Sequence, residues 1–355
     1  MIDIPGRENS LCGDVPVFRK TRGGWQMTSR EQVLQALESR AGETVSGEEL
    51  AAALGISRAA VWKAIGRLRE EGHHIEAGTN RGYCLIPDSD ILSPQGVAAC
   101  LGEPETARNI RVYPELDSTN LQAKRLALEG APDGTVILAE QQTAGRGRRG
   151  RVFFSPPGSG LYLSVLLRPA HLDAGSAVLI TTAVSVAVCR AVEQVTGQHL
   201  QIKWVNDLYC EGKKVCGILT EAVTGIESGE LESVVVGIGI NVEAREFPEE
   251  LRQVAGALYE HRPAGFTRNR LAAAVIRQLR ELDAMITDRS FLSEYRERSM
   301  VLGKPVLVYS GGEPEAAVAE DIDEQGALLV RCADGSLRRL STGEISIRVK
   351  AEKDN

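Results

Sequence analysis

Residues 145–151 spell Gly-Arg-Gly-Arg-Arg-Gly-Arg, which puts four guanidinium groups within seven residues and no acidic side chain among them. The whole chain has a formal net charge of −7, so this local positive charge does not follow from a basic composition. Glycine lets backbone amides approach a ligand closely, and arginine adds charge. The segment is therefore a candidate anion-binding loop, with a solvated basic loop as the alternative.

The same letters satisfy Gly-x-Gly-x-x-Gly, the dinucleotide-binding fingerprint, which requires a strand before it and a helix after it. Residues 135–139 are strand-like, but the loop continues into the β-like segment 152–154 and the breaker Ser-Pro-Pro-Gly at 155–158. Because no helix starts at the loop, a pyrophosphate would have no helix N-terminus to bind. This excludes a Rossmann-type dinucleotide site.

Three more polar segments lie on predicted strand ends or turns: Asp-Ser-Thr-Asn at 117–120, Lys-Trp-Val-Asn-Asp at 203–207 and Gly-Ile-Gly-Ile-Asn at 237–241. Ser118 or Thr119 could simply cap the helix that follows, which is a common role of these residue types. Lys203 lies among apolar residues, so we expect a half-buried ammonium group that needs an anionic partner. Asp207 or a substrate anion could be that partner, and the sequence leaves both open.

Residues 28–87 have the pattern of a winged helix-turn-helix domain. Helices are predicted over 30–37 and 47–54, and a third helix starts after Ser57 and runs to about Arg69. On the third helix, Val61, Ile65 and Leu68 recur at the spacing of one buried face. The segment 73–84 that follows is predicted to be a hairpin with its turn at 80–82, which would form the wing.

The opposite face of the third helix is basic. Residues 57–81 carry five Lys or Arg against three Glu, a net of +2 in a chain of net −7, which favours a DNA contact. The predicted DNA-binding residues are Ser57, Arg58, Ala59, Trp62, Lys63 and Arg67. Trp62 follows Val61 and should therefore be exposed. A protein-docking winged helix is the alternative, because the fold alone does not fix the function.

Length and composition indicate a soluble protein of two or three domains, since 355 residues with 43% hydrophobic and 25% charged side chains are ordinary for this class. No run of 18 apolar residues and no apolar leader is present, so we expect a cytoplasmic protein without a membrane span. The seven cysteines include no Cys-x-x-Cys pair, which argues against disulfides and structural zinc. Residues 1–27 are predicted to be a disordered extension.

The rest of the chain divides into two regions. Residues 105–300 alternate strand-like segments with helical ones and indicate a mixed α/β domain. The strands are predicted at 136–139, 161–167 and 234–242, and the long helices at 174–194 and 267–287. Residues 303–350 hold short strands at 305–309, 316–319, 327–331 and 344–348. Separated by turns, these four strands predict a small SH3-like β-barrel, so the fold class is α+β multidomain.

In this order the segments resemble those of the biotin protein ligases, in the bifunctional form that is also the biotin operon repressor. The shared signature is Asp-Ser-Thr-Asn, the Gly-Arg loop followed by Phe-Ser-Pro, Lys-Trp-x-Asn-Asp, Gly-Ile-Leu and Gly-Ile-Gly-Ile-Asn-Val. The similarity runs from about residue 30 to the C-terminus, and 47–66 look like the DNA-reading helix pair that monofunctional ligases lack. Val205 is a departure, because many members have proline there.

The resemblance implies an AMP-forming biotin–protein ligase. Biotin and Mg-ATP would form biotinyl-5′-adenylate and pyrophosphate, and a lysine of biotin carboxyl carrier protein would then take the biotinyl group. The enzyme must hold two anions, a carboxylate and a triphosphate, close together. Fixed cations and hydrogen-bond donors can do this, and no nucleophilic side chain is required. No covalent enzyme intermediate and no metal site built by the protein alone are expected.

The resemblance also assigns residues. The biotin site would contain Ser118, Thr119, Asn120, Gln142, Arg146, Gly147, Arg148 and Lys203. Lys203, Arg146 and Arg148 would be the catalytic cations. The ATP site would contain Arg149, Arg151, Asn206, Asp207 and Asn241. The Gly-Arg loop would close over the adenylate and retain it.

The bifunctional reading adds a regulatory expectation and leaves two alternatives. The adenylate-bound form should dimerise through the central sheet and bind a palindromic operator of biotin genes. A lipoate-type ligase would share the central fold but should lack the Gly-Arg loop. A ligand-sensing transcription factor without ligase activity is the alternative that is not an enzyme.

Overall fold

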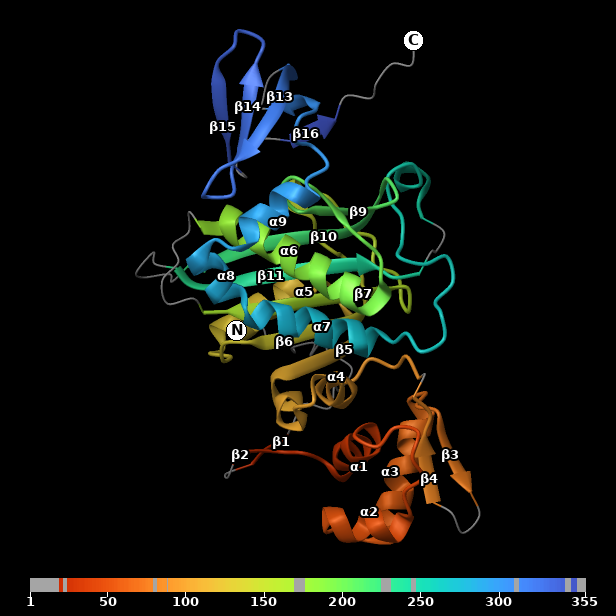
Figure 1. Cartoon of the computed structure of the whole chain (residues 1–355). Coiled ribbons are helices and arrows are strands. Elements are labelled where there is room, and N and C mark those ends of the chain that lie inside the picture. The colour runs from red at the N-terminus through yellow and green to blue at the C-terminus, as the bar shows by residue number, and fades with distance from the viewer. Residues whose placement is uncertain are drawn as a thin grey trace, which may run out of the picture.

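The computed structural model describes residues 19–21, 24–78, 82–87, 89–168, 176–224, 231–243, 247–309, 313–341 and 346–349. Three parts follow one another along the molecule: N-terminal helices with a small hairpin, a central sheet covered by helices, and a C-terminal sheet (Figure 1). The central part lies between the other two, which are at opposite ends of the molecule.

The N-terminal part is the predicted winged helix-turn-helix. It contains α1 (Ser29–Glu38), α2 (Gly47–Leu54), α3 (Arg58–Glu70), β3 (Ile75–Gly78) and β4 (Gly82–Leu85). The Ser57 side chain caps α3 by accepting from the Ala60 amide, and Gly55 ends α2 at a φ of 65°, in the left-handed region that favours glycine. Val61, Ile65 and Leu68 are buried as predicted. The wing turn was predicted at 80–82, and residues 79–81 lie outside the described residues.

The N-terminal extension differs from the prediction of disorder over 1–27. Strands β1 (Arg19–Thr21) and β2 (Gly24–Gln26) pair antiparallel, with Arg19 opposite Gln26. A hairpin this short is held by backbone hydrogen bonds between near neighbours, which do not require the apolar period that the sequence lacks. The prediction of disorder also covers residues 1–18, 22 and 23, which lie outside the described residues.

The central sheet has seven strands in the order β5-β6-β7-β11-β10-β9-β8. They are β5 (Ile110–Leu116), β6 (Thr135–Gln142), β7 (Gly160–Leu167), β8 (Gln201–Lys203), β9 (Asp207–Cys210), β10 (Lys213–Thr224) and β11 (Leu231–Asn241). Only β5 and β6 pair in parallel, and the other neighbours in this sheet are antiparallel. Because neighbouring antiparallel strands run in opposite directions, the end of one strand lies beside the start of the next. Motifs that are distant in the sequence therefore meet at one edge of the sheet.

Helices cover both faces of this sheet (Figure 1). On one face, Val234 and Val236 of β11 pack in the main core with α6 (Ala177–Thr196), α7 (Arg268–Arg280), α8 (Leu282–Asp288) and α9 (Phe291–Arg298). On the other face, Val235 packs with α5 (Thr119–Leu128) in a separate core. This alternation follows from the two-residue period of a strand.

Two helices of the central part bear on the sequence predictions. The helix predicted over 267–287 is two helices, because Glu281, with ψ near −1°, interrupts the α-helical run between α7 and α8. Each part buries its own apolar side chains. Helix α6 has the length and apolar composition of a membrane span, but 78% of its most apolar window is buried inside the protein.

An ion network around one buried arginine joins the central domain to the segment after the wing. Arg268, at the start of α7, is 3% exposed and bonds to Asp90 (Nε–Oδ2 2.7 Å) and to Glu140 of β6 (Nη1–Oε2 2.7 Å). Arg262 contacts Asp90 and also Glu243 (Nε–Oε2 3.1 Å). Asp90 precedes α4 (Pro94–Leu101) and the short helix Pro104–Asn109, neither of which was predicted. Charge pairing thus fixes this connection.

The C-terminal part is an antiparallel sheet in the order β15-β14-β13-β12-β16. Its strands are β12 (Pro305–Tyr309), β13 (Glu315–Ile322), β14 (Leu328–Cys332), β15 (Leu337–Leu340) and β16 (Ser346–Val349). Four match the prediction, and β15 was missed. No pairing between β15 and β16 is present among the described residues, so hydrogen bonds do not close the predicted barrel there. The sheet docks on the central domain through Gly326, whose carbonyl accepts from Trp204 Nε1 at 2.9 Å.

Candidate functional site

A cavity of about 720 Å³ opens where β6 ends, β7 begins and β11 ends. All four polar motifs that the sequence singled out meet in its wall. Each predicted ligase residue lines it: Ser118, Thr119, Asn120, Gln142, Arg146, Gly147, Arg148, Arg149, Arg151, Lys203, Asn206, Asp207 and Asn241. Gathering these residues at one sheet edge creates a cationic, hydrogen-bonding pocket.

The Gly-Arg loop folds back on itself like a small hairpin. The Gly147 amide donates to the Arg151 carbonyl at 2.7 Å, and the Phe153 amide donates to the Gly145 carbonyl at 2.9 Å. A Cβ at Gly145 would lie 2.3 Å from the Phe153 carbonyl oxygen, so this close approach requires glycine. Only a three-residue 3₁₀ turn, Arg148–Gly150, follows β6 here, which confirms the exclusion of a Rossmann site.

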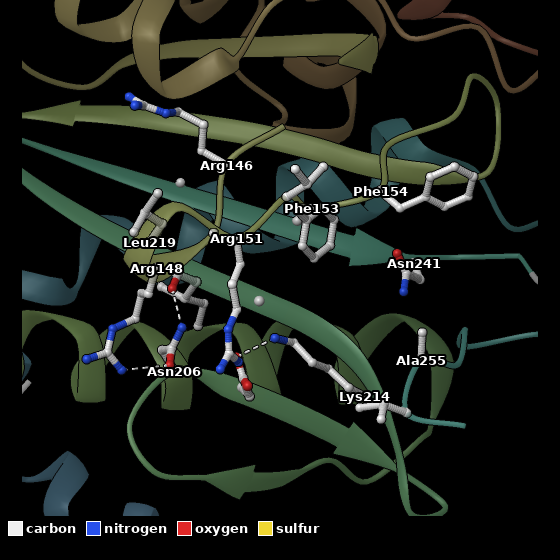
Figure 2. Close-up of a pocket in the computed structure, with 18 of the residues that line it drawn as sticks. Arg146, Arg148, Arg151, Phe153, Phe154, Asn206, Lys214, Leu219, Asn241 and Ala255 are labelled. Carbon is white, nitrogen blue, oxygen red and sulfur yellow. Dashed lines mark hydrogen bonds and ion pairs between the residues drawn. The ribbon is translucent and has the colours of Figure 1, made fainter. Parts of the chain in front are cut away.

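The four arginines of the loop do not point the same way. Arg148 is half-buried, and its Nη1 donates to Asn206 Oδ1 at 3.2 Å. Burial lowers the pKa of Arg148, and the nearby carboxylate of Asp207 acts against that shift. Arg151 extends toward Lys214, whereas Arg146 points away from Arg148 and Arg151 (Figure 2). The loop therefore offers one inward cation near Asn206 and further cations at the rim.

Lys214 is a pocket cation that the sequence analysis missed. Its Nζ lies 2.6 Å from Asp207 Oδ1, so Asp207 is paired with Lys214. The Nζ of Lys203, by contrast, lies 5.7 Å from the centroid of the Tyr209 ring, a cation–π distance. The sequence left Asp207 and a substrate anion open as partners of Lys203. It did not indicate Lys214, because the pairing of β9 with β10, which places Lys214 opposite Tyr209, is set by strand register rather than by a local pattern.

The Ser-Thr segment does not act as a simple cap. Ser118 occupies the N-cap position of α5, but its side chain makes no capping hydrogen bond, and it is 2% exposed. The amide of Thr119 donates to Gln142 Oε1 at 2.8 Å, and its Oγ1 lies 3.1 Å from the same oxygen. Gln142 Nε2 donates to Ser155 Oγ at 2.9 Å. These polar groups are therefore held together in the cavity wall.

The three asparagines bind protein carbonyls. Asn120 Nδ2 donates to Leu219 O at 3.2 Å, Asn206 Nδ2 to Ile218 O at 2.8 Å, and Asn241 Nδ2 to Gly256 O at 2.8 Å. The Oδ1 of Asn206 accepts from Arg148 Nη1, so this side chain joins the Gly-Arg loop to β10. Asn206 and Asn241 fix the β10 and 247–256 segments around the pocket.

Apolar residues complete the cavity, and none of them was predicted to lie there. A Cβ at Gly239 would lie 2.5 Å from the Phe153 ring, so glycine lets this ring lie against β11. Phe154 contacts Phe247 with ring centroids 6.2 Å apart. Phe247, Leu251, Gln253, Val254 and Ala255 form a second loop along the wall. Val254 is 49% exposed, an apolar group at the mouth of the cavity.

The candidate nucleic-acid interface is the outer face of α3. Ser57, Arg58, Ala59, Trp62, Lys63 and Arg67 are all exposed. Trp62 is 72% exposed, as the sequence predicts. Arg69 differs from these, because its guanidinium group donates to the Ile75 carbonyl at 2.7 and 2.9 Å and so ties α3 to the wing.

Comparison with known proteins agrees with this arrangement. The model of the Biotin/lipoate A/B protein ligase family matches residues 112–241, that of an HTH domain 29–84, and that of the Biotin protein ligase C terminal domain 301–348. The biotin protein ligase of Aquifex aeolicus, solved in complex with biotin and ATP, is 30% identical with a TM-score of 0.59, covering 68% of this chain and all of that one. The fold and site thus define a biotin/lipoate-type protein ligase with an added DNA-binding domain.

Relatives place the chain within that class. The bifunctional ligase/repressor BirA of Escherichia coli is 34% identical over 317 residues, 88% of this chain and 95% of the relative. The protein of the same name from Bacillus subtilis is 38% identical over 233 residues, 65% of this chain and 71% of the relative. The chain belongs to the bifunctional biotin ligase/repressor family.

Proposed function

We propose that this protein activates biotin with Mg-ATP to biotinyl-5′-adenylate and transfers the biotinyl group to a lysine of biotin carboxyl carrier protein. The observation that carries this proposal is the single cavity in which the Gly-Arg loop, Lys203, Asp207 and the Ser-Thr-Gln cluster meet. Such a cavity can hold a carboxylate and a triphosphate side by side. Family membership supports the same reaction.

In the first step a biotin carboxylate oxygen attacks the α-phosphorus of ATP, the bond to the β-phosphate oxygen breaks, and pyrophosphate leaves. Negative charge grows on the transferred phosphoryl group, and fixed cations stabilise it. Arg148 and Lys214 stand on the wall beside Asn206 and Asp207, so we assign them to the carboxylate and the α-phosphate. Lys203, whose Nζ lies at the Tyr209 ring, is the third cation that we assign to these two groups. Arg146 was predicted as a further catalytic cation, but its side chain points away from Arg148 and Arg151 (Figure 2).

In the second step the amine of the acceptor lysine attacks the acyl carbon and AMP leaves. We assign recognition of the biotin ureido ring to Ser118, Thr119 and Gln142, with Asn120 beneath them. Gly147 is assigned to the loop that closes over the carboxylate and the adenylate. Arg149 and Arg151 are exposed at the rim, where the β- and γ-phosphates of Mg-ATP would lie. Asn206, Asp207 and Asn241 are assigned to the nucleotide side.

The second activity that we propose is repression. The exposed basic face of α3 supports binding to operator DNA of biotin genes, and adenylate-bound protein is proposed to form the homodimer that presents two such faces to a palindrome. Both activities fit a cytoplasmic protein that acts away from membranes. Operator binding should weaken steeply with salt, because Arg58, Lys63 and Arg67 would displace counterions from phosphates.

One incubation tests the ligase. Purified protein, biotin, Mg-ATP and carrier protein should give a band on an avidin blot and release pyrophosphate. Replacing biotin by lipoate separates the lipoate-type alternative, since pyrophosphate release with lipoate alone would contradict our proposal. Absence of adenylate formation with either acid would leave the ligand-sensing transcription factor as the function.

A further inference from the structure

A chain of hydrogen bonds runs beneath the cavity, from β10 through α5 to β7. It starts at Glu221, whose Oε1 accepts from Lys124 Nζ at 2.6 Å and whose Oε2 accepts from Asn120 Nδ2 at 2.8 Å. Burial would raise the pKa of Glu221, but hydrogen bonds from Lys124 and Asn120 outweigh it and lower the pKa. Glu221 is therefore an ionised carboxylate at neutral pH, and a carboxylate can only accept.

This carboxylate fixes the orientation of the Asn120 amide. Both partners of Nδ2, the Glu221 carboxylate and the Leu219 carbonyl, are acceptors, so the NH₂ group must face them. The Oδ1 atom then faces Ser164 Oγ at 2.6 Å. A Cβ at position 237 would lie 2.1 Å from this Oδ1, so Gly237 is what lets the amide lie against β11.

The orientation passes on to Thr119. Ser164 Oγ lies 2.6 Å from Asn120 Oδ1 and 2.8 Å from Thr119 Oγ1, and it has one proton for the two contacts. Because Asn120 Oδ1 cannot donate, it takes the Ser164 proton. Two protein acceptors lie within reach of the Thr119 proton, Ser164 Oγ at 2.8 Å and Gln142 Oε1 at 3.1 Å. With the proton donated to either acceptor, the lone pairs of Thr119 are left for the cavity that it lines.

We propose that Glu221 and Ser164 are positioning residues that hold the Thr119 hydroxyl as an acceptor, so that this point of the site selects a ligand N–H over a ligand oxygen. The inference rests on the proposed function, in which a ureido N–H of biotin lies at Thr119. It gives Asn120 a role beneath the ligand instead of a direct contact. A site with a committed acceptor rejects an analogue that offers only oxygen, because two lone pairs then face each other.

The test compares biotin with its cyclic carbamate analogues, in which one or the other ureido N–H is replaced by oxygen. Adenylate formation is measured by the release of pyrophosphate. For wild-type protein, the analogue with oxygen at Thr119 should have a KM at least about 10-fold above that of biotin. Glu221→Gln offers an NH₂ group to Asn120, which allows the amide to turn and the Thr119 proton to face the cavity. In Glu221→Gln, the ratio of the KM for this analogue to the KM for biotin should be at least about 5-fold lower than in wild-type protein. The KM for ATP should stay within about two-fold of the wild-type value.

Two further variants keep the result interpretable. Ser164→Ala removes the link between Asn120 and Thr119 and should lower the same ratio, even if Glu221→Gln folds poorly. Ser233→Ala is the matched control, because Ser233 is equally buried on the sheet and its Oγ has no hydrogen-bond partner among the described residues. An unchanged ratio in Glu221→Gln or Ser164→Ala would overturn the inference. Failure of wild-type protein to release pyrophosphate with biotin would instead overturn the proposed function.

Discussion

At the scale of single residues, the chemistry depends on which cations face the bound carboxylate. Two lysines line the cavity, and they differ in environment. The Lys214 Nζ is 2.6 Å from Asp207 Oδ1 and stands near Arg151, whereas the Lys203 Nζ lies against the Tyr209 ring. The Asp207 carboxylate holds the Lys214 ammonium group in place at the cavity wall, so we predict that Lys214 contributes to binding a substrate anion.

We predict that Lys214→Ala lowers kcat/KM for biotinylation by two or more orders of magnitude, the usual loss when a transition-state donor is removed. Lys203→Ala, the variant that the sequence alone favours, should also lose activity, and the comparison shows which lysine contributes more. Transfer of radiolabelled biotin to carrier protein measures both. Near-wild-type turnover of Lys214→Ala would assign the role to Lys203.

A second residue-scale prediction concerns retention of the intermediate. Arg148 links the Gly-Arg loop to Asn206 by a 3.2 Å hydrogen bond and thereby ties the loop to the opposite wall. Arg148→Ala should slow adenylate formation and also let adenylate escape. Promiscuous biotin labelling of a bystander protein such as albumin, absent with wild-type protein, would reveal the escape. Arg149→Ala, an exposed loop control, should label bystanders much less.

At the scale of elements, the C-terminal end of α1 carries a buried acid. Burial raises the pKa of Glu38 to about 7. Burial also raises the pKa of Cys100 on α4, and the charge of Glu38 adds to that shift. The folded protein therefore holds the Glu38 proton at pH values where the unfolded chain has lost it. Stability from this group is complete below about pH 4.5 and falls as the pH rises through 7.

Glu38→Gln should remove that dependence. The variant is expected to raise Tm by about 3 °C at pH 8 and to leave it unchanged near pH 4.5, because the amide carries no charge to desolvate. Scanning calorimetry of the full chain at both pH values measures the effect. Glu48→Gln, an exposed change on α2, is the control. Equal shifts at the two pH values would show that charge burial is not the cause.

At the scale of the whole molecule, the ion network at Arg268 connects the two proposed activities. Glu140 lies on β6 two residues before Gln142, and Glu243 follows the end of β11, so both lie beside the cavity. Asp90, on the connection to the winged helix, bonds to Arg268 and Arg262. A change of the cavity strands on ligand binding would therefore reach the DNA-binding domain through buried charges.

Asp90→Asn should weaken this link. We predict that adenylate then promotes operator binding about 10-fold less than in wild-type protein, a coupling loss of the size that single contacts carry, with biotinylation within about two-fold of wild type. Fluorescence anisotropy with operator DNA at fixed salt, with and without biotin and Mg-ATP, measures it. Arg58→Ala, by comparison, should weaken operator binding by the same factor with and without biotin and Mg-ATP. Unaltered coupling in Asp90→Asn would exclude the network as the route.

Much of the architecture could be predicted from local sequence. Capping residues, apolar periods and turn signals act over a few residues. They predict the start of α3 after Ser57, the buried face of that helix, the strands β7 and β11, and the order of the motifs. Helix α4 was missed although Ser93 caps it, Pro94 starts it and Gly102 ends it. Where a local signal is absent the prediction was wrong or silent: the break at Glu281, the hairpin at 19–26 and strand β15. None of these has a distinctive residue pattern.

The sequence by itself determined which residue types are available: a loop rich in Gly and Arg in an acidic chain, a Ser-Thr segment before a helix, and a basic helix face. Only the tertiary structure decided their pairing. It placed Asp207 with Lys214, turned Arg146 away from Arg148, and directed Asn120 toward Glu221 beneath Thr119. The physical reason is that strand register and sheet order bring together residues more than a hundred positions apart, and these contacts set where each charge and proton lies.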